Sequence, residues 1–196
     1  MKPENVLVNS DGHLKLTDFG LSKEIKEEYY NSNSFCGSHA YLAPEMLENK
    51  PHGKSIDWYG IGTILYEFLI GVPPYFTPDQ EALYERIRKS PLILPSFIGG
   101  DCESLLKSLL ARNPHARLGA QKGASEIKEH AWFRDVNWED VGRKRTYPKV
   151  YLAKDLKPKQ ERIIMKDLLD SNERDARTQR FKNKELKNVK DWSFTN

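Results

Sequence analysis

The sequence has very little cysteine and no long apolar run. Only Cys36 and Cys102 occur among its 196 residues, without the spacing of a metal-binding or disulfide-rich domain. The longest apolar stretch, YGIGTILYEFLIGV, is too short to cross a bilayer and contains Glu67. No positively charged start followed by an apolar segment marks a secretory signal. We therefore expect no membrane span, and we predict a reducing location, the cytoplasm or the nucleus.

The net charge of +3 conceals an uneven distribution. Residues 140–196 carry 16 Lys and Arg against 9 Asp and Glu, whereas residues 1–139 carry 15 against 19. A basic tail can indicate nucleic acid or anionic lipid, but here acids are mixed among the bases and no aromatic series accompanies them. We interpret the tail as a solvated extension and expect no nucleic-acid partner.

Local patterns predict a small hairpin followed by helices. Valines and leucines alternate on either side of an Asn-Ser-Asp-Gly turn, which predicts a β-hairpin over residues 5–17. Residues 20–42 are polar and predict an exposed loop. The segment SIDWYGIGTILYEFLIG is apolar on all sides, so it predicts a buried central helix that begins with Ser55 as its cap and ends at Gly71. Thr77 is expected to cap the next helix. Shorter helices are expected at residues 43–49, 101–111 and 123–130.

Three short motifs, in a fixed order, carry the chemistry: K-P-E-N at the start, D-F-G after the hairpin, and A-P-E after the polar loop. Together with SFCGSHAYLAPE, the central helix and ARLG, they resemble the catalytic half of a protein kinase of the AGC group, which contains the cyclic-nucleotide-dependent kinases and protein kinase C. The resemblance implies a serine/threonine kinase that transfers the γ-phosphoryl group of ATP to protein substrates. It also implies an α+β fold: a mainly helical C-terminal lobe with a small hairpin over residues 1–139, an irregular AGC tail over residues 140–196, and no N-terminal lobe.

The resemblance implies ATP and Mg²⁺ as cofactors and assigns their binding to three residues. Asp18 would be a carboxylate ligand of magnesium and Asn5 an amide ligand of a second ion, in keeping with the preference of Mg²⁺ for oxygen. Lys2 would lie near the transferred phosphoryl group. The alternative is that Asp18 is a turn residue and that Asn5 caps a strand.

The resemblance assigns binding of the peptide substrate to two acidic residues on different segments. Glu4 and Glu67 match positions that bind an arginine two residues before the phosphorylated residue, and two carboxylates can hold one guanidinium. The alternative is a pair of ordinary surface acids. In the resembled group a hydroxyl at the position of Ser38 contacts the catalytic loop, and Ser38 keeps that hydroxyl. His39 and Ala40 stand where the group usually has proline and glutamate. A preference for basic peptides is therefore a hypothesis.

Two serines match regulatory phosphorylation sites. Ser34 stands at the activation-loop position, where a phosphate would order the loop through cationic side chains, and Ser193 stands in a hydrophobic motif near the end of the chain. An upstream activating kinase would then be a partner. The alternatives are an unmodified loop serine and a frayed terminus.

Four further residues are predicted to be structural. Glu45 and Arg117 would form a buried ion pair, Asp57 would anchor the catalytic loop, and Gly20 completes the D-F-G motif.

In the resembled family an aspartate, the general base, directly precedes the position of Met1, and these residues do not include it. They also contain no G-x-G-x-x-G or V-A-I-K segment. We therefore expect a polypeptide of these residues to be inactive alone, since loss of a base costs about 10²–10⁴ in rate. The alternative is a non-catalytic kinase-lobe module that docks peptides or a regulatory partner.

Overall fold

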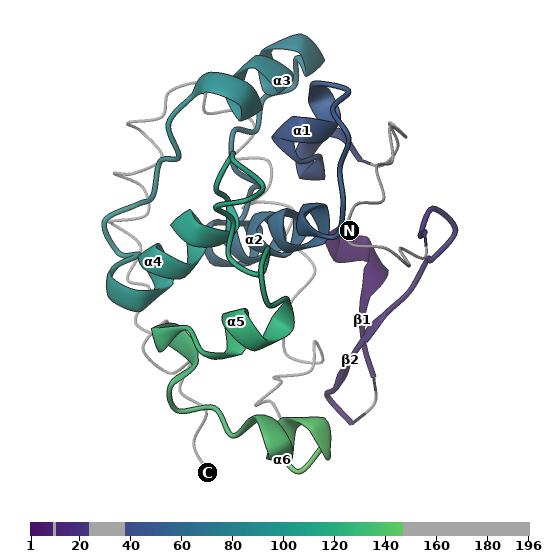
Figure 1. The fold of residues 1–196 in the computed structure, drawn as a ribbon, viewed down its shortest axis with the longest axis vertical. Coiled ribbons are helices and arrows are strands. Elements are labelled where there is room, and N and C mark those ends of the chain that lie inside the picture. The colour runs from purple at the N-terminus through teal and green to yellow at the C-terminus, as the bar shows by residue number, and fades with distance from the viewer. Residues whose placement is uncertain (10, 24–37, 147–196) are drawn as a thin grey trace, which may run out of the picture. The chain divides into compact units, whose positions relative to one another are not determined.

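The computed structural model describes residues 1–9, 11–23 and 38–146 (Figure 1). The described residues separate into two units, the first made of Met1–Leu7 with Lys15–Arg134 and the second of Val8–Leu14 with residues 135–146. Ser34 and Ser193, the predicted phosphorylation sites, lie outside the described residues.

The chain begins with a short 3-10 helix, η1 (Pro3–Asn5), and a two-stranded antiparallel sheet, β1 (Val6–Val8) and β2 (Leu14–Leu16). The turn is closed by a bond from the Asn9 amide to the His13 carbonyl at 2.8 Å. Gly12 adopts a left-handed φ of 84°, which glycine tolerates without steric cost. The predicted hairpin is therefore confirmed.

Helices make up most of the first unit, as Figure 1 shows. They are η2 (His39–Tyr41), α1 (Pro44–Leu47), α2 (Ser55–Ile70), α3 (Gln80–Lys89), α4 (Gly100–Leu109), α5 (Ala124–Lys128) and η3 (Ala131–Phe133). The expected mixed fold, mainly helical with a small sheet, is thus observed. None of the helices in these described ranges is long and apolar enough to cross a membrane.

The core of this unit is centred on the contact between α2 and α4. Leu105, Leu106 and Leu109 of α4 are at most 1% exposed. A Cβ atom added at Gly62 would lie 2.9 Å from Cβ of Leu109, so the two helices approach closely because this position has no side chain. Each buried leucine contributes about 1.5–3 kcal/mol of apolar transfer free energy.

Two predicted caps are wrong. The residue preceding α2 is Lys54, and Ser55 is already helical and caps nothing. The cap of α3 is Asp79, whose carboxylate accepts a bond from the Ala82 amide at 2.6 Å, so Thr77 lies outside the helix. Aspartate and threonine are both good caps, and the one nearer the helix prevails here.

The second unit contains one short helix among its described residues, α6 (Trp138–Gly142). The Asn137 side chain caps it by accepting bonds from the amides of Glu139 and Asp140. This helix crosses residue 140, where we expect an irregular tail to begin, so regular structure extends further along the chain than predicted. An asparagine cap followed by two acids is a favourable helix start.

Candidate functional site

The structure brings together the side chains of Asn5 and Asp18, the two predicted metal ligands. The Asn5 side-chain amide donates to the Asp18 carboxylate at 3.4 Å. The hairpin makes this possible, because its ends are joined by a bond from the Thr17 amide to the Asn5 carbonyl at 2.9 Å. The Thr17 hydroxyl donates to the same carbonyl at 3.3 Å. The two side chains therefore face each other from neighbouring ends of one hairpin.

Asp18 has an unusual backbone. Its φ is 60°, in the left-handed region that favours glycine, although aspartate is among the residues that tolerate it. Its carboxylate accepts a bond from the Gly20 amide at 3.4 Å and remains exposed. A non-glycine residue in this conformation costs about 1–3 kcal/mol, and such strain is concentrated at functional sites.

The Asn5–Asp18 pair fits a magnesium–nucleotide complex better than a site made of protein alone. Carboxylate and amide oxygens suit Mg²⁺, which is commonly held by one or two carboxylates together with substrate phosphates. Rotation of the Asn5 amide by half a turn would present its oxygen beside the Asp18 carboxylate. Within the part of the chain that is described, no three His, Cys, Asp or Glu residues gather as a metal cluster. The remaining ligands would therefore come from the nucleotide and water.

Lys2 precedes η1 in an extended conformation, and its carbonyl accepts a bond from the Asn5 amide at 3.1 Å. The residue is partly buried. Its ammonium group has no ion pair with any described residue. The Lys2 charge therefore lies on the same short segment as Asn5 and is available to an external anion.

Glu4 and Glu67 lie close enough to repel each other. The Tyr41 hydroxyl donates to the Glu67 carboxylate at 2.6 Å. Partial burial raises the pKa of the Glu67 carboxyl, the Tyr41 hydrogen bond lowers it, and the Glu4 charge raises it again. Burial and the bond to Glu67 also raise the pKa of Tyr41. A cation between these acids would relieve the repulsion.

The segment before Tyr41 has features that the sequence pattern does not reveal. Among the described residues, no hydrogen bond from the Ser38 hydroxyl is present, so its predicted contact with the catalytic loop is not seen. His39 is hydrogen bonded through Nδ1 to the Tyr84 hydroxyl, and the two rings lie 5.7 Å apart. Tyr84 also accepts a bond from the Gln80 side chain at 2.7 Å. This segment is thereby tied to α3.

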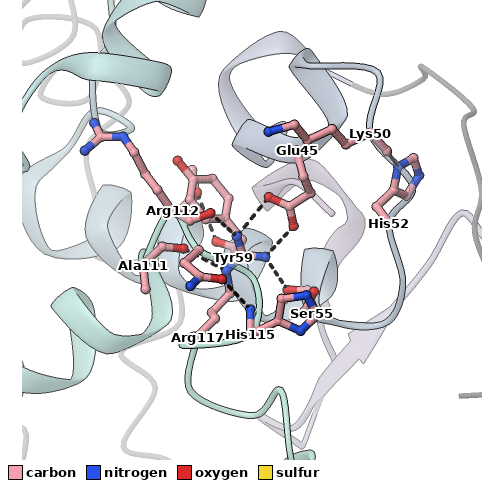
Figure 2. Close-up of polar contacts among 11 residues, drawn as sticks. Glu45, Lys50, His52, Ser55, Tyr59, Ala111, Arg112, His115 and Arg117 are labelled. Atoms are coloured by element: carbon pink, nitrogen blue, oxygen red, sulfur yellow. Dashed lines mark hydrogen bonds and ion pairs between the residues drawn. The ribbon is translucent and has the colours of Figure 1, made fainter. Parts of the chain in front are cut away.

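Glu45 and Arg117 form the predicted buried ion pair, which Figure 2 shows in detail. The Arg117 guanidinium donates to both carboxylate oxygens of Glu45, at 2.7 and 2.9 Å. It also donates to the carbonyls of Ser55 at 2.9 Å and Ala111 at 3.0 Å, and it lies over the Tyr59 ring. Glu45 is 4% exposed and Arg117 1%. The pair thus joins α1 to the start of α2 and to the loop after α4.

Asp57 lies in the first turn of α2, near the start of the chain. Partial loss of hydration raises the pKa of the Asp57 carboxyl, and the positive charge of the Met1 ammonium group lowers it. Gly60, one turn later, would place an added Cβ 3.5 Å from Cβ of Met1. The role of Asp57 as an anchor of the catalytic loop stays a prediction.

Tyr41, Tyr84 and Gln80 were not predicted from the sequence. Tyr41 lies within the motif SFCGSHAYLAPE, but its partner Glu67 is 26 positions away and nothing in the spacing connects them. Tyr84 is likewise 45 positions from His39. Neither residue disturbs the helical periodicity, so no local signal could have identified them.

Comparison with known proteins agrees with these features. Residues 1–133 match the protein kinase domain family. The chain is 44% identical over 144 residues to Protein kinase 2 of Dictyostelium discoideum, which covers 74% of this chain and 30% of that protein. It is 44% identical to the Serine/threonine-protein kinase AtPK1/AtPK6 of Arabidopsis thaliana, over 76% of this chain and 32% of the relative. It is 41% identical to the RAC-beta serine/threonine-protein kinase of Rattus norvegicus, over 76% and 31%.

The chain spans about a third of the length of the curated relatives it matches. These relatives are AGC-group serine/threonine kinases. The matched region contains the hairpin, the Asn5–Asp18 pair and the Glu45–Arg117 ion pair. On the match over residues 1–133, the chain belongs to the protein kinase family.

Proposed function

We propose that residues 1–139 are the C-terminal lobe of a serine/threonine protein kinase and that residues 140–196 are its AGC tail. The observation that carries this proposal is the facing pair of Asn5 and Asp18 at the ends of one hairpin. A carboxylate and an amide at this distance suit magnesium ions held against phosphate oxygens. When bound, Mg²⁺ neutralises charge on the ATP phosphates and holds them in line for transfer.

The chain's own residues would then have separate tasks. Asp18 and Asn5 would hold the metal, and the Lys2 ammonium group would bind the anionic group being transferred. Glu4 and Glu67 would position a basic side chain of the peptide, with Tyr41 orienting the Glu67 carboxylate. Correct placement of two reactants is the main contribution a kinase can make.

The preference for basic peptides is part of this proposal. It is supported by the repulsion between the Glu4 and Glu67 charges and by the partial burial of Glu67. Ala40 supplies no carboxylate to this face, so the preference should be limited to one arginine near the phosphorylated residue. Physiological substrates, the upstream activating kinase and a cytoplasmic or nuclear location remain predictions.

Metal binding can be tested without an activity assay. Mn²⁺ added with ATP to the ¹⁵N-labelled chain should broaden the amide resonances near Asn5 and Asp18 by paramagnetic relaxation. Asp18→Asn should abolish this broadening, whereas Asp135→Asn, a change of another exposed carboxylate, should leave it intact. Equal broadening in the wild type and in Asp18→Asn would refute the assignment.

We further propose that a polypeptide of these 196 residues does not transfer phosphate by itself. The residues include the metal ligands and the peptide-side acids, but no residue matching the general base or the glycine-rich loop. The test is incubation with radiolabelled ATP and an arginine-rich serine peptide. Turnover above that of a reaction without protein would overturn this part of the proposal.

A non-catalytic docking module is the second candidate, and exposed apolar side chains favour it. Leu7, Leu16, Phe19 and Leu21 are each at least 50% exposed. Apolar surface of this kind is commonly covered by another protein surface. Metal binding separates the two candidates, because a docking module needs no magnesium ligands. Loss of Mn²⁺ broadening would leave docking as the better reading.

A further inference from the structure

We propose that a basic cavity beside α1 binds an acidic segment of a partner protein. The cavity has a volume of about 510 Å³ and lies between α1 with its following loop, the end of α3, and the loop after α4. This volume lies within the range of about 300–1,000 Å³ that is typical of ligand pockets. None of the predicted metal or substrate residues lines it, although Glu45 of the buried ion pair does.

Positive charge predominates in this cavity. Lys50, Arg88 and Arg112 line it together with two acids, Glu45 and Glu48. Glu45 is already neutralised by the guanidinium of Arg117 behind it. Glu48 pairs with Lys50 at 2.6 Å. The Arg112 charge therefore remains in excess, and Arg88 has only a 3.5 Å contact with Glu85, so an anionic occupant is favoured over a cationic one.

Arg112 is held rigidly. Its Nε donates to the Ile87 carbonyl at 2.7 Å and its Nη2 to the Ser90 carbonyl, and its guanidinium lies 5.4 Å from the centre of the Tyr75 ring. These contacts involve carbonyl dipoles and a ring, so they do not cancel a full charge. Within the described chain, no carboxylate pairs with Arg112 and its Nη1 atom makes no hydrogen bond. A preorganised cation loses little conformational entropy when it binds a carboxylate.

Two further donors face the same cavity. The Arg88 guanidinium donates to the Leu47 carbonyl at 2.7 Å and lies 3.5 Å from the Glu85 carboxylate, a long and solvent-exposed contact. His115 lines the cavity, and its ring has no hydrogen-bond partner among the described residues. One peptide carboxylate could therefore bind Arg112 while a second lies near Arg88 or His115.

The remaining wall is apolar and stiff. Pro44, Pro51 and Pro114 line it, and proline has a fixed φ and no backbone donor. These rings can contact the methylene groups of glutamate side chains without offering hydrogen bonds of their own. An occupant with alternating methylenes and carboxylates, a short glutamate-rich peptide, matches both parts of the cavity. This complementarity of charge favours an acidic peptide.

The direct test uses acetyl-pentaglutamate amide as the probe, titrated into the full ¹⁵N-labelled chain, with the pentaglutamine peptide as a neutral control. We expect the glutamate peptide to shift resonances of residues 44–51, 88 and 112–115, and the glutamine peptide to leave them unchanged. Inorganic phosphate and a short oligothymidylate are added in separate titrations. Shifts confined to other residues, or equal shifts with phosphate or oligothymidylate, would overturn the assignment to an acidic peptide.

Matched variants sharpen the result. Lys50→Glu should weaken pentaglutamate binding about tenfold, because it reverses a charge at the cavity rim. Lys107→Glu is the control, since Lys107 is also exposed and also pairs with a glutamate, Glu103 at 2.5 Å, but lies outside the cavity. Glu48→Gln should strengthen binding, because it removes the acid that competes for Lys50. Equal losses in the two lysine variants, or weaker binding by Glu48→Gln, would refute the proposal.

Discussion

Replacement of Arg117 by alanine is expected to lower the free energy of unfolding by about 3–5 kcal/mol. The substitution would leave the Glu45 carboxylate, 4% exposed, as an unpaired charge. It would also remove the donors to the Ser55 and Ala111 carbonyls. Since small domains are stable by about 5–15 kcal/mol in total, such a loss would unfold a large fraction of the molecules. Glu45→Ala should be comparably harmful, because it strands the buried guanidinium.

Urea denaturation followed by tryptophan fluorescence and by circular dichroism would measure these losses. Lys89→Ala is the control, since Lys89 forms a 2.7 Å pair with Glu85 but is 74% exposed, and its loss should cost less than about 1 kcal/mol. The double variant Glu45→Leu/Arg117→Met should be within about 1–2 kcal/mol of the wild type, because no buried charge is left unpaired. Losses below about 1 kcal/mol in both alanine variants would show that the ion pair is not desolvated as the structure indicates.

Three other predictions concern the site and its support. Asp18→Gly should raise stability by about 1 kcal/mol, because glycine accepts the positive φ, while it abolishes Mn²⁺ broadening; unchanged or lower stability in urea would count against strain at this residue. Binding of an arginine peptide should weaken as the pH falls and Glu67 becomes protonated. Tyr41→Phe should move the midpoint of this pH dependence to higher pH, because the tyrosine bond lowers the pKa of Glu67. A fluorescence-anisotropy titration that gave the same midpoint for the variant and the wild type would contradict this. Gly119→Ala should destabilise the chain by about 1–3 kcal/mol in urea, because an added Cβ would lie 2.8 Å from the Trp58 ring and the φ is 91°, and a neutral result would refute the close contact.

The sequence predicted best the features that depend on a single segment. The central helix was placed to within one residue at each end, because its apolar residues continue without interruption to Gly71, which has a φ of 93°. The start of α3 was wrong because the segment Thr77–Gln80 offers two good caps two residues apart, and only the packed structure decides between them. The hairpin was identified from its Asp-Gly turn. Because Asn5 and Asp18 lie at the two ends of this hairpin, their proximity could be predicted from local sequence alone.

Contacts between distant segments were predicted only where the family resemblance supplied the pair. The Glu45–Arg117 ion pair joins residues 72 positions apart and came from that resemblance. The Tyr41–Glu67 and His39–Tyr84 bonds depend on how η2 lies against α2 and α3, which periodicity does not encode. The residues that form these bonds are common in helices and loops, so their residue types alone did not mark them as partners.

The two main polar pairs differ in how firmly the chain holds them. The bonds of the Glu45–Arg117 pair are 2.7 and 2.9 Å long and are shielded from water, whereas Asn5 and Asp18 are 3.4 Å apart. The buried pair fixes the segment that follows the predicted peptide-binding residues, so its order does not depend on a ligand. The Asn5–Asp18 pair has weak internal bonds and a strained backbone, so divalent cations would supply the missing order.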